Sequence, residues 1–415
     1  MYQLNIQPAD KLFFRDARPM SGSSIGNGSE WPLPSVLHSA LQSAIYEYWV
    51  NLGKPDWESD HKNMTNKEKE RKDKNKYLKS TKKFGGLKTI GPFPQKNGEI
   101  FFPTPADIEP NNNLMKPSNT IGSSNLSKPL KYTVVNTGVP TKDVVGQWIS
   151  ASELTKYLDG VKELQTSSSN ELYISEAVPG VAIDPDTRTN TDGKFFQSEY
   201  LRLLDSENVS IAAFGECIAK KFNGEEQDIV EKLFNDTKQL SMIFGGQRGT
   251  AYVSCMRTKN NLFDNDANFS GKLLKLTLLS PAVFSKGWLP DWVNEDDGRV
   301  ELKCRPDRNE YQSRNKWREA IKNSKTIGAS LVAARIPKPI SFSGWKLDMD
   351  KDNAGGVPKA TRVAVPAGAV YYFECDDEEQ ATILYKELHG NIKSTFYGNH
   401  GFGLGVCSNW NLINF

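Results

Sequence analysis

Four glycines fall within eight residues near the end of the chain, in the segment YGNHGFGLG at residues 397–405. Glycine has no Cβ, so such a loop lets a ligand approach the backbone closely and can point N–H groups at phosphate oxygens. A Walker loop would require GK[ST], and a dinucleotide-binding loop would require a strand before it and a helix after it, whereas this loop precedes the last expected strand. The pattern argues against a nucleotide cofactor and leaves two interpretations, a loop that follows a phosphate strand and a structural turn.

Arginines lie at two further places where an anion could bind. Arg15, Asp16 and Arg18 follow the first expected strand, shortly before a helix that should begin at Ser35. The first turn of a helix has N–H groups without intrahelical partners, and these favour an anion. Arg248 stands in a glycine-flanked turn that would leave its guanidinium exposed. Both arrangements suit a phosphate, and ordinary surface ion pairs explain Arg15 and Asp16 equally well.

Histidine offers the main enzymatic possibility, because the sequence has no HExxH or paired-carboxylate motif. The chain has four histidines, His38, His61, His389 and His400. The apolar periodicity puts His38 on the exposed face of the first helix, where it would serve as general base on an RNA 2′-hydroxyl. Asp16 and Tyr46 are candidate partner acids, and the spacing selects neither. A metal-independent ribonuclease therefore stays open as an alternative.

The composition is that of an ordinary folded protein, with 38% hydrophobic and 25% charged residues among 415. This length predicts two domains with insertions. No apolar run approaches the roughly 18 residues of a membrane span, and the N-terminus has no charged region followed by an apolar one. We therefore expect a cytoplasmic protein with no membrane partner. Five scattered cysteines predict buried free thiols rather than disulfides or a zinc site, and no cofactor or metal is expected.

Charge is unevenly distributed along the chain. Residues 61–83 contain ten Lys or Arg against three Asp or Glu, a local charge of +7 in a chain whose net charge is +2. This basic stretch could hold a nucleic-acid backbone, but its interleaved acids favour a solvated insertion. Residues 54–83 and 111–128 are both polar and poor in apolar residues, so we expect them to be surface insertions.

The apolar pattern predicts strands and a few helices in two similar units. In the first unit, strands are expected at 2–6, 11–15, 209–214 and 251–256, with helices from Ser35 and at 229–240. An extended arm is expected at 171–204. In the second unit, strands are expected at 273–279, 369–375 and 406–413, with a helix at 377–389. The order predicts an α+β protein of two ferredoxin-like (RRM-like) domains, at 1–270 and 271–415.

Four motifs carry a resemblance to a known family. They are LFFRDARP at 12–19, GGQR at 245–248, VPAGAVYYFE at 365–374 and the terminal glycine-rich loop. In that order they resemble the third subunit of type III-B CRISPR (Cmr) effector complexes, a family within the repeat-associated mysterious protein (RAMP) superfamily. The segment EAVPGVAID at 176–184, with Thr187, Thr189 and Gly193, is similar to the protruding hairpin of that family.

The resemblance implies a non-catalytic subunit that holds the 5′ tag of the CRISPR RNA. It implies two ferredoxin-like RAMP domains, docking against the large polymerase-like subunit and the backbone RAMP subunits, and only indirect contact with target RNA. The alternative is a RAMP endoribonuclease that processes guide RNA with His38. A third possibility is an architectural subunit that contacts protein alone.

Carried over to this sequence, the resemblance implies RNA contacts by Arg15, Arg18, Arg248, Gly401, Gly403 and Gly405. Gln247 stands where the family usually has an acid. Phe14, Phe402 and Tyr397 are candidates for base stacking, with core packing as the other interpretation. The full predicted RNA-binding set is Phe14, Arg15, Asp16, Arg18, Ser35, His38, Gln247, Arg248, His400, Gly401, Phe402, Gly403 and Gly405. We expect these groups from both halves of the molecule to converge on one groove.

Overall fold

The computed structural model describes most of the chain. The described residues are 1–15, 25–26, 30–55, 57–58, 84–111, 113–119, 124, 126, 130–138, 144–161, 163–184, 186–221, 225–237, 239–256, 263, 269–306, 310–346 and 357–413. Asp16, Arg18 and the basic stretch 61–83 lie outside them. No helix of the described residues is long and apolar enough to cross a membrane.

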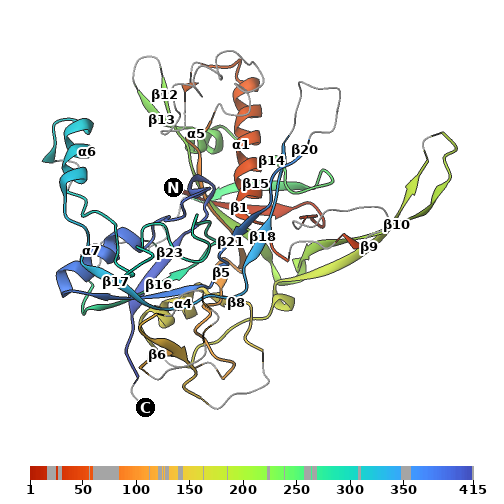
Figure 1. The fold of residues 1–415 in the computed structure, drawn as a ribbon. Coiled ribbons are helices and arrows are strands. Elements are labelled where there is room, and N and C mark those ends of the chain that lie inside the picture. Colours follow the sequence, from red (N-terminus) through yellow and green to blue (C-terminus); the bar gives the residue numbers. More distant parts are fainter. Residues whose placement is uncertain are drawn as a thin grey trace.

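A seven-stranded antiparallel sheet dominates the N-terminal half (Figure 1). Its spatial order is β14 (Leu240–Ile243), β15 (Thr250–Met256), β1 (Tyr2–Pro8), β11 (Val209–Glu216), β4 (Lys88–Lys96), β5 (Glu99–Pro103) and β8 (Trp148–Ser150). Along the chain, helix α1 (Pro34–Asn51) follows β1 and helix α5 (Ile229–Asp236) follows β11. The four strands β15-β1-β11-β4 are therefore interleaved with two helices.

Both helices pack on the same face of this sheet. Leu4 and Ile6 of β1 share a core cluster with Leu41 of α1 and Leu233 of α5. Alternating strand residues supply one apolar face, and apolar residues at helical spacing supply the stripe that covers it. Each fully buried Leu or Ile stabilises the fold by roughly 1.5–3 kcal/mol relative to exposure.

A four-stranded antiparallel sheet organises the C-terminal half. Its order is β17 (Ala329–Arg335), β22 (Val370–Cys375), β16 (Leu273–Leu278) and β23 (Gly405–Asn409). Helix α7 (Glu378–Leu388) begins at the cap residue Asp377, whose side chain accepts a hydrogen bond from the Gln380 amide, and packs on one face through Leu384 and Leu388. Helix α6 (Arg314–Asn323) stands apart from the sheet and buries none of its residues (Figure 1).

The two sheets share a core. One apolar cluster joins Ile90 and Phe93 of β4 to Leu404 and to Val406 of β23. Helix α4 (Ala151–Leu158) contributes Tyr157 to the same cluster. The two halves of the chain are therefore packed directly against each other.

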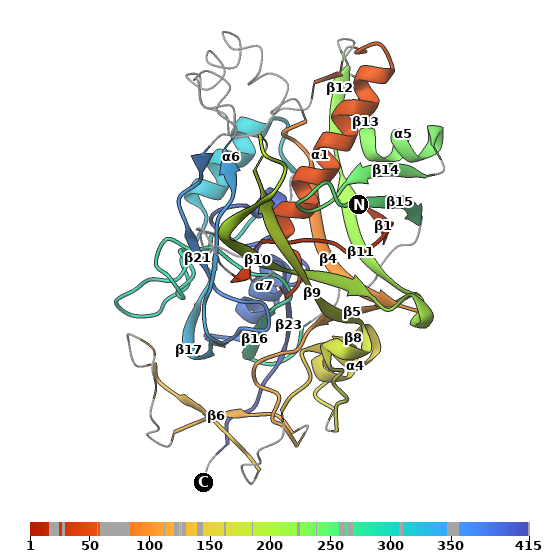
Figure 2. The same ribbon diagram turned by 90° about the vertical axis from the view of Figure 1, so that its right-hand side faces the viewer.

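A long hairpin projects from the first sheet, to the right in Figure 1 and toward the viewer in Figure 2. It is formed by β9 (Tyr173–Ile183) and β10 (Asn190–Leu203) and covers the segment for which an extended arm was expected. Strand β2 (Ile25–Gly26) runs parallel to β10. At the base, Leu12 and Leu201 exchange two backbone hydrogen bonds of 2.8 Å, which attach the hairpin to the segment after β1.

The remaining elements are short. They are β3 (Trp57–Glu58), β12 (Ile218–Lys221) and β13 (Glu226–Asp228) in one small sheet, the pairs β6 (Lys116–Ser118) with β7 (Thr133–Val135), β18 (Ile340–Phe342) with β21 (Arg362–Ala364), and β19 (Trp345–Lys346) with β20 (Val357–Pro358), and the 3-10 turns η1 (Ser169–Glu171), η2 (Asp205–Glu207) and η5 (Gly398–His400).

The predicted α+β class is confirmed, since the described residues form mostly sheets with a few helices, and several boundaries are corrected. Residues 12–13 form isolated bridges rather than the strand expected at 11–15. The helix expected at 229–240 ends at Asp236, and Leu240 opens β14 instead. The last strand is shorter than expected, because β23 ends at Asn409. All five cysteines are free thiols, but only Cys217, Cys375 and Cys407 are buried, whereas Cys255 and Cys304 are half-buried.

Candidate functional site

The two arginine segments lie side by side. The Gly246 amide donates a 2.8 Å hydrogen bond to the Phe13 carbonyl, so residues 12–15 run beside the turn between β14 and β15. Gly245 has φ of +89°, and a Cβ there would lie 2.7 Å from the Phe13 oxygen. Only glycine permits this approach. The fold thus brings Arg15 and Arg248 onto neighbouring backbone segments.

The turn itself presents Arg248 outward. Gln247 and Arg248 both have left-handed backbones, with φ of 52° and 58°, and both side chains are exposed. The Tyr200 hydroxyl donates a hydrogen bond to Oε1 of Gln247, which links the turn to the hairpin strand β10. An amide at position 247 can accept this bond without a charge, so the missing acid does not leave the turn unsupported.

Ion pairs hold the base of the hairpin beside this turn. Arg202 binds Glu176 at 2.7 Å and Asp10 at 2.9 Å, and Lys11 binds the other oxygen of Glu176 at 2.7 Å. The hydrogen bond from Arg202, followed by that from Lys11, lowers the pKa of Glu176. The Lys11 ammonium also lies 5.0 Å from the ring centroid of Tyr200. These pairs are partly accessible to solvent and therefore individually weak.

A groove opens between the two sheets next to Arg15. Its cavity has a volume of about 900 Å³ and is lined by residues of both halves of the chain. The N-terminal half contributes Arg15, Trp31, Pro34, Pro92 and Phe93, and the C-terminal half contributes Leu279, Pro281, Lys338, Ile340, Phe342 and Pro366, among others. Its walls are largely apolar, and the charged groups among the described residues that line it are Arg15, Glu30 and Lys338.

The start of α1 faces this groove. Pro34 is the first helical residue and Ser35 the second, and no side chain caps the helix start. The first turn carries no acidic residue, so no side-chain carboxylate of this turn neutralises the positive end of the helix dipole. Trp31 is held in place by a 2.9 Å hydrogen bond from its indole to the Pro92 carbonyl. Pro34 has no N–H, and the Val36 amide donates to the Leu33 carbonyl at 2.9 Å, so of the first three helical residues Ser35 is the one that can offer its amide to an anion. The arrangement offers cations and this amide for phosphate and flat apolar walls for bases.

The glycine-rich loop does not contribute N–H groups to this groove. Gly401, Gly403 and Gly405 are buried. Their amides donate to the carbonyls of Gly398 at 2.9 Å, Pro281 at 2.7 Å and Asn391 at 3.4 Å, respectively. The expectation that these amides bind phosphate is wrong for this conformation, and the alternative of a structural turn describes the loop.

Close packing explains the glycines instead. A Cβ on Gly401 would lie 2.6 Å from the Thr89 carbonyl of β4, and its φ is +93°. A Cβ on Gly403 would lie 2.4 Å from the Ser394 amide, and its φ is +82°. The loop therefore fits tightly between the last strand and the first sheet. It joins the two halves of the molecule.

His38 is buried, so its expected place on the exposed face of the first helix is wrong. It is 2% exposed, and its ring stacks on His400 with centroids 3.9 Å apart and planes 7° apart. Its Nδ1 lies 3.2 Å from the Thr89 hydroxyl. Helical spacing could not foresee that η5 from the far end of the chain covers this face. A general base must reach its substrate, and the position of His38 in this structure prevents that.

Two of the three aromatic candidates, Phe14 and Phe402, are core residues, whereas Tyr397 is half-buried and packs edge-on against Phe342. Phe14 is 4% exposed and packs edge-on against Phe244 at 5.4 Å. Phe402 is fully buried and stacks on Phe342 at 5.3 Å. Neither ring is available to a base. Trp31, which the sequence did not single out, lines the groove, and the lone indole in a loop gave no signal of this.

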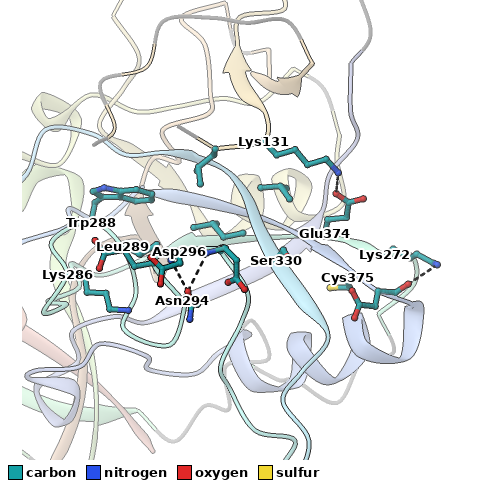
Figure 3. A pocket seen from close by; sticks show the side chains of 17 residues that line it. Lys131, Lys272, Lys286, Trp288, Leu289, Asn294, Asp296, Ser330, Glu374 and Cys375 are labelled. Carbon is teal, nitrogen blue, oxygen red and sulfur yellow. Dashed lines mark hydrogen bonds and ion pairs between the residues drawn. The ribbon is translucent and has the colours of Figure 1, made fainter. Parts of the chain in front are cut away.

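A second cavity, of about 600 Å³, lies on the C-terminal half (Figure 3). Lys131 pairs with Glu374 at 2.6 Å, and Lys272 donates to the Asp376 carbonyl at 3.1 Å. Five acidic side chains line this cavity against three lysines, so it suits a phosphate strand less well than the groove does. In the described part of the chain, no three His, Cys, Asp or Glu side chains are close enough to hold a metal ion.

Comparison with known proteins gives one decisive match. A family model described as CRISPR-associated protein (Cas_Cmr3) matches residues 4–410. No curated protein matches the chain.

Solved structures give weaker likenesses. A chain of the cryo-EM structure of type III-B Cmr-beta bound to cognate target RNA is 14% identical, with a TM-score of 0.43, over 89% of this chain and 86% of that chain. A chain of the Csm3-Csm4 subcomplex of the type III-A CRISPR-Cas interference complex is 15% identical, with a TM-score of 0.34, over 91% and 93%.

Proposed function

The chain belongs to the Cas_Cmr3 family of CRISPR-associated proteins, and from this premise we propose that it binds the 5′ tag of the guide RNA in the groove between its two sheets. The family match confirms the resemblance drawn from the four motifs and makes the chain a subunit of a type III-B CRISPR effector complex. In the proposed role it does not cut RNA, and it bridges the tag to the large polymerase-like subunit and the backbone RAMP subunits in the cytoplasm.

One observation carries the proposal. Arg15, the uncapped start of α1 and Lys338 lie around a single groove, and the turn that exposes Arg248 runs beside Arg15. Arginines and helix amides bind phosphate oxygens, and unstacked bases of single-stranded RNA bind apolar and aromatic walls. The opening of about 900 Å³ has room for more than one nucleotide unit. His38 has no place in this role.

We further propose that residues 1–270 and 271–415 are two ferredoxin-like domains. In the first, β1-α1-β4-β11-α5-β15 gives the spatial order β15-β1-β11-β4. In the second, β16-α6-β17-β22-α7-β23 gives the order β23-β16-β22-β17. Both follow the same strand-helix-strand-strand-helix-strand sequence with the first strand between the fourth and the third. The groove then lies at a junction of domains, a common place for ligand sites.

The test reverses the charges that the proposal uses. The variant Arg15→Glu/Arg248→Glu is compared with the wild-type protein and with Arg318→Glu, a reversal on the exposed helix α6. We expect the double variant to recover several-fold less guide RNA with the assembled complex and to show a shallower salt dependence of binding. The control should match the wild type. Unchanged recovery of guide RNA by the double variant would contradict the proposal.

A further inference from the structure

We infer that a buried polar network of Asp107, Tyr157, Lys275 and Tyr372 positions the groove, because it holds the two sheets in one mutual arrangement. The role in RNA binding rests on the proposed function, whereas the role in fixing the arrangement does not. Of these four residues only Tyr372 falls within a motif of the resemblance, VPAGAVYYFE at 365–374, and nothing in the sequence assigned a role to any of the four.

The network is compact and fully enclosed. Asp107 is 0% exposed and Lys275 is 4% exposed, and Nζ of Lys275 lies 3.1 Å from Oδ2 of Asp107. The Tyr372 hydroxyl donates to the same oxygen at 2.9 Å, and the Tyr157 hydroxyl donates to Oδ1 at 2.9 Å. Tyr157 also shares a 2.9 Å hydrogen bond with the Thr277 hydroxyl. The Lys275 ammonium lies 3.8 Å from the centroid of the Tyr157 ring.

Its members come from both halves of the molecule. Asp107 follows β5 of the first sheet, and Tyr157 lies in α4. Lys275 of β16 and Tyr372 of β22 are cross-strand partners in the second sheet. Because side chains alternate along a strand, Lys275 points away from the face that Leu274 and Leu276 present to α7. It therefore points toward the first half, where it meets Asp107.

A buried charge network adds little to the stability of the fold, but it makes any other arrangement of the two halves costly. Burial lowers the pKa of Lys275, with the attraction of Asp107 opposing this shift, and burial raises the pKa values of Tyr157 and Tyr372. The desolvation of both charges offsets much of their attraction, so the pair adds little net stability. Separating the partners would leave a buried charge unpaired at much greater cost. Apolar contacts between the halves are non-directional, whereas the hydrogen bonds and the ion pair of this network are satisfied in only one arrangement of the two halves.

The network and the groove share backbone segments on the first half. Pro103, at the end of β5, lines the groove four residues before Asp107. Between them, the Ala106 amide donates a 2.8 Å hydrogen bond to the Gly368 carbonyl. Gly368 has φ of +85°, and a Cβ there would lie 2.5 Å from the Thr104 carbonyl, so the two segments are in close contact.

The network and the groove also share backbone segments in the second half. Lys275 and Thr277 lie in β16, and the residues that follow this strand, Leu279 and Pro281, line the groove. Ala367, which precedes Gly368, lines it as well. A change in how the network pairs would therefore move both walls of the groove.

The experiment removes the network without leaving a buried charge. The variant Asp107→Leu/Lys275→Met/Tyr372→Phe is labelled with bio-orthogonal spin labels at Glu47 on α1 and Lys386 on α7, and the distance distribution between the labels is measured. The control, Tyr371→Phe, deletes a buried hydroxyl on the same strand that bonds only within the second half, to the Trp288 carbonyl. Binding of a single-stranded RNA carrying the 5′ tag is measured on the same proteins.

We expect a narrow distribution for the wild type and the control, and a broadened or shifted one for the triple variant while it still unfolds cooperatively. RNA affinity should fall about tenfold if about one molecule in ten keeps the competent arrangement. A lower melting temperature with an unchanged distribution would overturn the inference, because it shows a purely stabilising role. If the triple variant does not fold, Tyr372→Phe against Tyr371→Phe gives the same comparison, and equal distributions there overturn the inference.

The two proposals fail separately. Should the distribution broaden while the wild type itself does not bind the tag RNA, the proposed function fails and the positioning role stands. Should the wild type bind the RNA and the triple variant bind it equally well with an unchanged distribution, only the positioning role fails.

Discussion

Two glycine-rich segments resemble each other in the sequence and differ in the structure. The turn at 245–249 uses its glycines to lie against Phe13 and leaves Arg248 exposed. The loop at 398–405 uses its glycines to pack against Thr89 and Ser394, and its central residues are buried. A glycine cluster therefore reports that something approaches the backbone closely. Whether that is a ligand or the protein itself depends on which segments the fold brings alongside.

The largest expected effect is on the buried loop. Phe402→Ala should lower the free energy of unfolding by about 3–5 kcal/mol, because the fully buried ring leaves a cavity beside Phe342. Chemical denaturation measures this. Phe396→Ala, at a position that is 40% exposed, is the control and should cost less than about 1.5 kcal/mol. Equal costs at the two positions would show that the loop is not part of the core.

The second largest expected loss of stability comes from a glycine substitution in the same loop. Gly401→Ala combines a left-handed backbone with a Cβ placed 2.6 Å from the Thr89 carbonyl. Gly160 also has a positive φ, of +73°, but a Cβ there meets nothing within 4 Å. Gly160→Ala should therefore cost only about 1 kcal/mol of backbone strain, and Gly401→Ala clearly more. If both variants unfold at the same denaturant concentration, the close approach to β4 does not matter to stability.

A substitution in the exposed turn at 245–249 should leave stability nearly unchanged and alter RNA binding instead. Arg248→Ala should change the free energy of unfolding by less than about 0.5 kcal/mol, since the side chain is exposed. It should also reduce the slope of log affinity against log salt concentration for tag RNA by about one. Titrations at several salt concentrations measure this slope. An unchanged slope would remove Arg248 from the RNA contacts.

The smallest expected effect is a pH-dependent loss of hydrogen-exchange protection at the hairpin base beside the exposed turn, with no such loss in the buried loop at 398–405. The hydrogen bond from Arg202 and then that from Lys11 lower the folded-state pKa of Glu176, so this stabilisation is complete above the ordinary value of about 4.3 and is lost as the pH falls through the lowered value. Exchange protection of the Leu201 amide at the hairpin base should therefore weaken as the pH falls below that ordinary value. The Gly403 amide, bonded to the Pro281 carbonyl, should keep its protection. In Glu176→Gln the acid-dependent loss at Leu201 should disappear.

The sequence predicted the regular parts of the fold well. Alternation and helical spacing identified β1, α1, β11, β15, β16, β22 and α7 within a few residues. No local pattern indicated β4, because Gly91, Pro92 and Pro94 are typical of a loop. Its place in the sheet comes from pairing on both sides, with β11 and β5, which no local pattern encodes.

The site was harder to predict for the same reason. The motifs drew attention to Arg15 and Arg248, and the fold puts their segments side by side. His38 was placed on the wrong face, because helical spacing within α1 carries no information about η5, which covers it. Trp31, Lys338 and Asp107 carried no local signal at all. The roles proposed for them depend on long-range packing, which only the assembled structure reveals.

Crosslinking the guide RNA inside the assembled complex by ultraviolet light, with the attached peptides identified by mass spectrometry, tests the central claim most directly. We predict crosslinks to peptides that contain Arg15, Trp31 or Arg248, and none to residues 398–405. Crosslinks confined to residues 398–405, with none in the groove or the turn, would contradict the account.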